Sequence, residues 1–133
     1  MNRNKNFQSA KDVMVKKIIL IDGMATAKEA VEIMRNEKVD SLIVKKRNHQ
    51  DAYGIVNVHD FIKGVILLDK TSEEVNVFEI MTKPVVSVPA SMDIRYVASL
   101  LINVGIRMAP VEENGEYIGM ISLSDLVLEN LLF

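Results

Sequence analysis

The chain has 133 residues, 49% of them hydrophobic, which suffices for one compact domain or for two half-domains that share a core. Its formal net charge of −2 lacks the basic excess that is typical of general nucleic-acid binders, so a nucleic-acid partner is not expected. The absence of cysteine excludes disulfides and thiolate metal sites, and no apolar run approaches the roughly 20 residues that span a bilayer, so we expect a soluble, cytoplasmic protein without a membrane partner.

The spacing of apolar residues predicts one series of elements, which then recurs along the chain. The first series is a short helix at 9–14, a strand, an amphipathic helix through 27–34, a strand at 41–44, a polar turn, a strand at 53–58 and a helix that begins near Asp60. Thr26 and Glu29 have the spacing of a capping box, which marks the start of the amphipathic helix. The unit is therefore β-α-β-β-α, preceded by a short helix.

A polar segment at 69–74 separates this series from the second one. The second series is a short helix around 75–80, a strand, a helix capped by Asp93 with apolar residues through 94–101, strands at 107–111 and 117–123, and a helix that begins near Asp125. Residues 80–111 align with 13–44 at an offset of 67, and residues 119–125 align with 54–60 at an offset of 65, so the loop of the first copy is two residues longer. Repeats of this kind bury each other's faces.

The order of these elements, with Val13-Met14 at the start and a Gly-apolar-apolar-polar-x-x-Asp sequence before the last helix, resembles the cystathionine-beta-synthase (CBS) domain. Two such domains in tandem resemble a Bateman module, with motif 1 at 9–68, a linker and short helix at 69–79, and motif 2 at 80–133. The resemblance implies an α/β (α+β) fold in which the motifs pack sheet to sheet about a pseudo-twofold axis. It also implies a homodimer and two clefts in each chain. In many family members, the clefts bind adenine nucleotides, S-adenosylmethionine or cyclic dinucleotides, which regulate and are not consumed.

Asp125 lies where a strand passes into a helix, a position with unpaired N–H groups and the positive end of the helix dipole. Its carboxylate offers two acceptor oxygens, which match the 2′ and 3′ hydroxyl donors of a ribose. Ser122 and Ser124 add two hydroxyls beside it, and family members that bind adenosine resemble this group closely. The alternative is that Asp125 only caps its helix.

The first copy differs at the matching positions. Asp60 has Asn57 and His59 as neighbours, which makes a weaker ribose motif, and a purely capping role is again the alternative. For phosphate the difference is reversed. Arg107 stands where nucleotide-binding relatives, such as the gamma subunit of AMP-activated protein kinase, carry a basic residue that faces phosphate, whereas its equivalent, Asp40, would repel phosphate. The alternative for Arg107 is a solvated strand residue.

In the family, each cleft combines the Asp motif of one copy with the early strands of the other. The resemblance therefore implies one cleft that contains Ile18, Ile19, Asp40, Ser41, Met120, Ser122, Ser124 and Asp125. It implies a second cleft that contains Asn57, His59, Asp60, Val85, Val86, Arg107 and Met108. On this hypothesis, the better ribose motif and the phosphate-binding cation belong to different clefts.

Two functions from different classes remain open. In the first, the module senses AMP, ADP, ATP or S-adenosylmethionine and passes the result through its dimer surface or to an unidentified protein effector. In the second, it is a ligand-free dimerisation scaffold. No enzyme, metal site or required cofactor is expected, because the chain has no Gly-rich nucleotide fingerprint and only two histidines. The basic run at 45–47 is expected to face solvent, with a contact to phosphate or a partner as the alternative.

Overall fold

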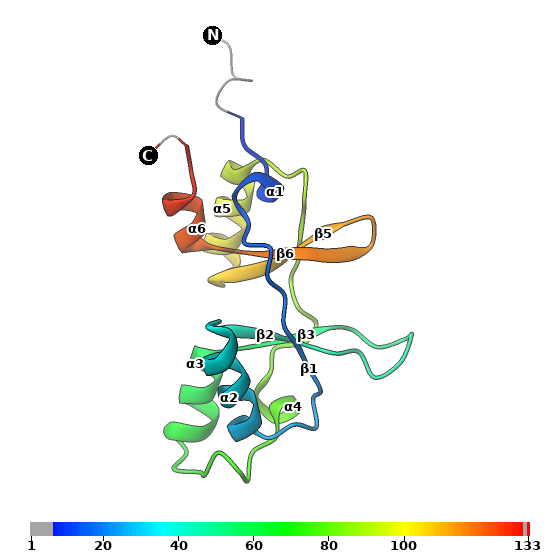
Figure 1. The fold of residues 1–133 in the computed structure, drawn as a ribbon, viewed down its shortest axis with the longest axis vertical. Coiled ribbons are helices and arrows are strands. Elements are labelled where there is room, and N and C mark those ends of the chain that lie inside the picture. The colour runs from blue at the N-terminus through cyan, green and yellow to red at the C-terminus, as the bar shows by residue number, and fades with distance from the viewer. Residues whose placement is uncertain (1–6, 132) are drawn as a thin grey trace. The chain divides into compact units, whose positions relative to one another are not determined.

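The computed structural model describes residues 7–131 and 133 (Figure 1) and divides into two compact units. Unit 2 is the continuous segment Ile19–Val85, whereas unit 1 joins the segment that ends at Ile18 to the segment that begins at Val86. Each unit contains a three-stranded sheet and several helices, which confirms the predicted α+β class. No helix in the described part of the chain is both long enough and apolar enough to cross a membrane.

Unit 2 contains most of the first series of elements. These are β1 (Leu20–Ile21), α2 (Ala27–Glu37), β2 (Ser41–Val44), β3 (Gly54–Asn57), α3 (Val58–Phe61), the π-helix η2 (Ile62–Ile66) and α4 (Val77–Ile80). Strand β2 lies in the centre of the sheet, parallel to β1 and antiparallel to β3. The predicted capping box starts α2, because the Glu29 N–H donates to Thr26 Oγ1 and the Thr26 N–H donates to Glu29 Oε1, both at 3.1 Å.

Unit 1 contains the second series together with the first short helix. Its elements are α1 (Ala10–Val13), β4 (Val88–Pro89), α5 (Ile94–Val104), β5 (Met108–Glu113), β6 (Glu116–Ser122) and α6 (Leu123–Leu128). Strand β5 is central, parallel to β4 and antiparallel to β6. Asp93 caps α5 as predicted, by accepting the N–H of Arg95 at 2.9 Å. Asn114 and Gly115 both have positive φ, the conformation that a tight hairpin turn requires.

Each unit has its own hydrophobic core, formed where the helices cover one face of the sheet (Figure 1). The core of unit 1 includes the buried residues Ala10, Val13, Val88, Val97, Leu101, Ala109, Val111 and Ile121. The core of unit 2 includes Ile21, Ala30, Leu42, Val44, Val56, Phe61, Val75 and Val77. Burial of α1 and α4 therefore completes the core of the unit to which each short helix belongs.

The first residues of each sequence copy pair with a strand of the other copy's sheet through backbone hydrogen bonds. In unit 1, Val15 and Met120 exchange two N–H···O bonds of 2.8 and 2.9 Å, and in unit 2, Ile55 and Thr82 exchange two bonds of 2.9 Å. A Cβ at Gly119 would lie 2.7 Å from the Val15 carbonyl oxygen, which is too close for any side chain. The glycine of the Gly-apolar-apolar-polar-x-x-Asp sequence is therefore required for this contact.

The helix that follows the last strand of each unit begins two residues before the aspartate near which it was predicted to start. Helix α3 begins at Val58 and α6 begins at Leu123, so Asp60 and Asp125 occupy the third helical position and not the start. The reason is that Asn57 and Ser122 act as the N-caps, with side-chain oxygens that accept the N–H groups of the two aspartates.

Candidate functional site

The junction between β6 and α6 holds Asp125 in a fixed orientation. The Ser122 N–H donates to Asp125 Oδ2 at 2.9 Å, and the Asp125 N–H donates to Ser122 Oγ at 3.1 Å. These two bonds form a capping box, so Asp125 does cap its helix. Only one carboxylate oxygen takes part, and Oδ1 accepts no hydrogen bond from residues 7–131 and 133. The carboxylate is thus held by one oxygen, while the other remains available to a hydroxyl donor.

The side chains around Asp125 leave this junction accessible. Ser124 is exposed, whereas Ser122 and Asp125 are half-buried. Leu126 is buried in the core of unit 1 and anchors the first turn of α6. A serine hydroxyl and a carboxylate oxygen therefore occur together at the surface of a well-anchored helix start, where a polyhydroxyl group such as ribose can be bound.

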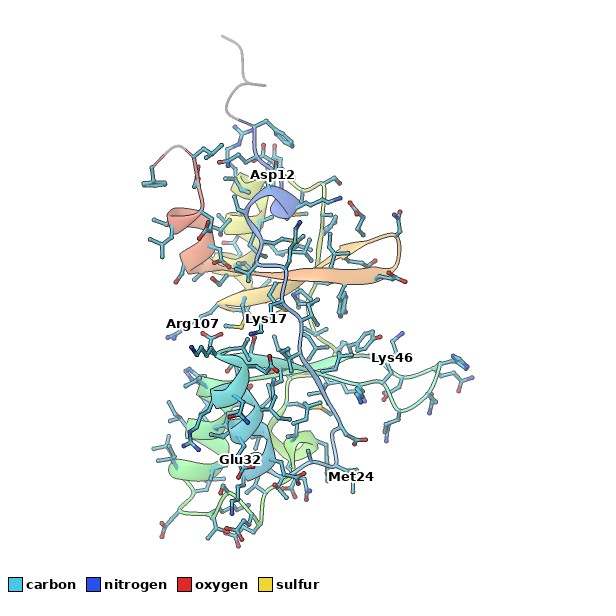
Figure 2. The ribbon with its side chains drawn as sticks, in the orientation of Figure 1. Asp12, Lys17, Met24, Glu32, Lys46 and Arg107 are labelled. Atoms are coloured by element: carbon cyan, nitrogen blue, oxygen red, sulfur yellow. The ribbon has the colours of Figure 1, made fainter. Side chains whose placement is uncertain are left out.

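Arg107 and Met108 lie beside the same junction within unit 1. The Leu123 N–H donates to the Arg107 carbonyl oxygen at 2.9 Å, and Met108 is opposite Ser122 in the sheet register. The side chain of Arg107 is exposed where the chain enters β5 (Figure 2). The backbone of Arg107 thus lies next to the Asp125 junction, while its side chain is exposed to solvent.

The matching junction in unit 2 has the same backbone geometry and a different charge. The Asn57 N–H donates to Asp60 Oδ2 at 2.9 Å, and the Asp60 N–H donates to Asn57 Oδ1 at 3.3 Å. The Val58 N–H donates to the Asp40 carbonyl oxygen at 3.3 Å. Burial raises the pKa of the Asp60 carboxyl above its ordinary value, against the opposing effects of the Asn57 N–H and the nearby His59 and Lys63 side chains. The Asp60 carboxyl is therefore more readily protonated than an ordinary aspartate.

The predicted site residues divide between the two units. Unit 1 contains Ile18, Val86, Arg107, Met108, Met120, Ser122, Ser124 and Asp125, and unit 2 contains Ile19, Ser41, Asn57, His59, Asp60 and Val85. Within unit 2, Ser41 is opposite Asn57 in the register, and His59 is exposed. Every predicted contact that joins a residue of one unit to a residue of the other stays a prediction.

Sequence reasoning missed an ion-pair network in the loop between β2 and β3. The side chain of Asp51 is only 7% exposed, and its carboxylate contacts Lys83 Nζ at 2.5 Å and Arg47 Nε at 3.1 Å. The Lys83 ammonium, with further help from Arg47, holds the pKa of Asp51 well below its usual range. No local pattern indicates a pair separated by this length of chain. In the part of the chain that the structure describes, no group of three or more His, Asp or Glu side chains is arranged to hold a metal ion.

Two units with the same element series, each with a capped carboxylate at a strand-to-helix junction, define a tandem pair of small β-α-β-β-α domains. The family model of the CBS domain matches residues 10–66 and 77–130. The chain belongs to the CBS domain family, as its sequence predicts.

The chain is similar to curated protein sequences and to solved structures. Over 103 residues, the chain is 29% identical to an uncharacterised protein of Methanopyrus kandleri, a match that covers 77% of this chain and 52% of the relative. The chain spans about half the length of the curated relatives it matches. Among solved structures, a hexameric CBS-CP12 protein from bloom-forming cyanobacteria is 35% identical, with a TM-score of 0.89 over 93% of this chain and 68% of that one.

A second similar structure was solved with ligands. It is a CBS domain pair in complex with 5′-methylthioadenosine and S-adenosyl-L-methionine. Its identity to this chain is 21%, with a TM-score of 0.76 over 90% of this chain and 93% of that one. This likeness shows a shared fold.

Proposed function

We propose that this chain is a regulatory module that binds an adenosine-containing ligand and carries out no catalysis itself. The observation that supports it most is the state of Asp125, whose Oδ2 is held by the Ser122 N–H while Oδ1 accepts no hydrogen bond from any residue that the structure describes. A carboxylate held in this way accepts a ribose hydroxyl on its free oxygen without first having to be oriented, which lowers the entropic cost of binding. Ser124, exposed beside it, adds a further hydrogen-bonding group.

The ligand class rests on chemistry and on one relative. The solved CBS domain pair with this fold is in complex with 5′-methylthioadenosine and S-adenosyl-L-methionine, and both of these compounds contain adenosine. AMP, ADP and ATP offer the same adenosine with phosphate added. In our proposal, the Asp125 junction holds the ribose of such a ligand, and residues of the early strands, including Ile18, Ile19 and Ser41, complete its cleft.

Arg107 is proposed to bind phosphate in the cleft to which Asp60 contributes. Its guanidinium is exposed, and a guanidinium donates two parallel hydrogen bonds to phosphate. On this basis, Arg107→Ala weakens binding of AMP and leaves binding of adenosine to the Asp125 cleft unchanged. An equal loss for adenosine and AMP in the Arg107→Ala variant would contradict the assignment of the two groups to separate clefts.

The proposed route of signalling is a second chain or an effector protein bound to the apolar helix surfaces. Ile66 and Leu67 at the end of η2 are 67% and 71% exposed, and Leu128 of α6 is 78% exposed. Large apolar side chains in such positions are typical of protein contacts. A homodimer that covers these helices is our proposal, and the hexameric relative supports oligomerisation in proteins of this fold.

The test is a thermal-shift screen of the purified protein after removal of any carried-over ligand. The panel contains adenosine, 5′-methylthioadenosine, S-adenosylmethionine, AMP and ATP, with the matching guanine compounds as controls. A ligand present at about 100 times its dissociation constant stabilises the folded state by roughly 2.7 kcal/mol, which the screen detects. We expect a shift that is selective for adenine. No shift for any compound would contradict ligand sensing and would favour the dimerisation scaffold.

A further inference from the structure

The β-hairpins of the two units carry opposite charges at equivalent positions. The loop between β2 and β3 contains Lys45, Lys46 and Arg47, all exposed, and it extends beyond the sheet of unit 2 (Figures 1 and 2). The hairpin of β5 and β6 contains Glu112, Glu113 and Glu116. We call these the basic hairpin (residues 45–51) and the acidic hairpin (residues 112–116). Since the repeat places both hairpins after the same kind of strand, their opposite charges are a specific difference between the copies.

The basic hairpin is held in one conformation by a carboxylate beneath it. Asp51 accepts the Arg47 backbone N–H at 2.8 Å and the Arg47 Nε–H at 3.1 Å, and it pairs with Lys83 outside the loop. Lys46 Nζ lies 5.0 Å from the centroid of the Tyr53 ring, within the range of a cation–π contact. These contacts fix the loop while its lysines face solvent, so a partner binds it with little loss of loop entropy.

The acidic hairpin concentrates negative charge although this opposes its own folding. Glu113 is directly opposite Glu116 in the sheet register, and like charges in that position are destabilising. Lys11 Nζ contacts the Glu113 carboxylate oxygens at 3.0 and 3.1 Å, which offsets part of this repulsion. Glu112, next to an irregularity of the strand, remains exposed.

Beside the acidic hairpin there is a surface hollow of about 460 Å³. It is lined by Ser87, Pro89, Ala90, Ser91, Glu112, Glu113 and Asn114. The Glu112 carboxylate and the two serine hydroxyls in this lining are acceptors for an ammonium group, whereas Glu113 already pairs with Lys11. The hollow is therefore complementary in charge to a lysine-bearing hairpin.

We propose that the basic hairpin of one chain docks onto the acidic hairpin and the adjacent hollow of a second copy. Every copy carries one hairpin of each charge, so the contact joins unlike surfaces and can be repeated from chain to chain, as in rings or filaments. It uses the hairpins and none of the apolar helix surfaces. Because its attraction is between exposed charges, salt weakens it, whereas an apolar helix contact persists in salt.

The test measures molecular mass by sedimentation velocity over a range of protein concentrations in about 0.1 M and about 1 M salt, where the screening length falls from about 10 Å to about 3 Å. We expect the mass of the wild type to rise with concentration only in the lower salt. Two variants reverse one hairpin each, Lys45→Glu/Lys46→Glu and Glu112→Lys/Glu116→Lys. Each variant alone is expected to lose the salt-sensitive increase, and an equimolar mixture of the two is expected to regain it.

The control is Lys28→Glu/Lys70→Glu, which changes the net charge by the same amount as Lys45→Glu/Lys46→Glu, at exposed positions outside both hairpins. It is expected to associate as the wild type does. The milder Lys45→Gln/Lys46→Gln variant gives the same comparison if charge reversal disturbs folding. A wild-type mass independent of concentration in both salts would overturn the proposal. Association of the Lys45→Glu/Lys46→Glu variant alone, or its absence in the mixture, would overturn it as well.

Discussion

Gly119→Ala should destabilise the protein strongly, because the N-terminal segment packs directly against Gly119 of β6. A Cβ at this position would lie 2.7 Å from the Val15 carbonyl oxygen and 2.6 Å from Met14 Sδ. The methionine sulfur can move aside, but the carbonyl belongs to the backbone bridge between Val15 and Met120. The added methyl group must therefore push the whole N-terminal segment away from the sheet.

The size of the effect follows from the bonds at stake. Displacing the segment weakens two backbone hydrogen bonds, each with a net contribution of about 0.5–1.5 kcal/mol. Overpacking adds about 1–3 kcal/mol, and the smaller backbone entropy of the unfolded alanine variant returns about 0.4–1 kcal/mol. These ranges centre on a loss of about 3 kcal/mol in the free energy of unfolding. With a typical urea slope of about 2 kcal/mol per molar, the midpoint falls by about 1–2 M.

Urea unfolding followed by circular dichroism measures this change, and Gly23→Ala is the matched control. A Cβ at Gly23 would lie 3.4 Å from Phe78 Cβ and 3.5 Å from Val44 Cγ1, which are ordinary packing distances. Gly23→Ala should therefore shift the free energy of unfolding by less than about 1 kcal/mol. If Gly119→Ala unfolded at the same urea concentration as Gly23→Ala, the close packing of the N-terminal segment on β6 would be refuted.

Two further predictions concern pH. The Lys83 ion pair lowers the pKa of Asp51 from its usual 3.8, so its stabilisation is complete above about pH 4 and is lost as the pH falls further. Asp51→Asn should lower the melting temperature at pH 7 and flatten its fall below about pH 4, and an unchanged melting profile would refute this. Burial raises the pKa of Asp60, so ionisation opposes folding as the pH rises through that pKa. Asp60→Asn should therefore melt at or above the wild-type temperature at pH 7, with the difference vanishing in acid, whereas a lower melting temperature at pH 7 would contradict it.

The order of the elements was predictable because their signals are local. The apolar period locates α2 and α5, and the caps at Thr26 and Asp93 mark where they start. The starts of α3 and α6 were also within reach, since Asn57 and Ser122 each stand three residues before an aspartate, the spacing of a capping box. Because Asn57 and Ser122 also fit the ends of the preceding strands, the predicted helix starts fell nearer to the aspartates.

The pairing of the first residues of each sequence copy with a strand of the other copy was not predictable from local patterns. The spacing of apolar residues around Val15 predicts that one face is buried. It does not indicate a partner as far along the sequence as Met120. For the same reason, no local sequence pattern predicts the ion pair between Asp51 and Lys83. The sequence also does not predict the π-helix at 62–66, because its apolar residues fit an ordinary α-helical pattern.

The most direct test of the proposed function is calorimetric titration of the wild type, Asp125→Asn and Asp12→Asn with 5′-methylthioadenosine, S-adenosylmethionine and AMP. Asp12 closes a similar capping box in α1, with Oδ2 accepting the Ser9 N–H at 2.9 Å, so its variant controls for loss of a cap. A hydrogen bond to a charged group contributes about 1.5–3 kcal/mol, so Asp125→Asn should weaken binding by about 10- to 100-fold. Asp12→Asn should bind as the wild type does. Equal affinities for all three proteins, or no binding by any of them, would contradict a ribose site at Asp125.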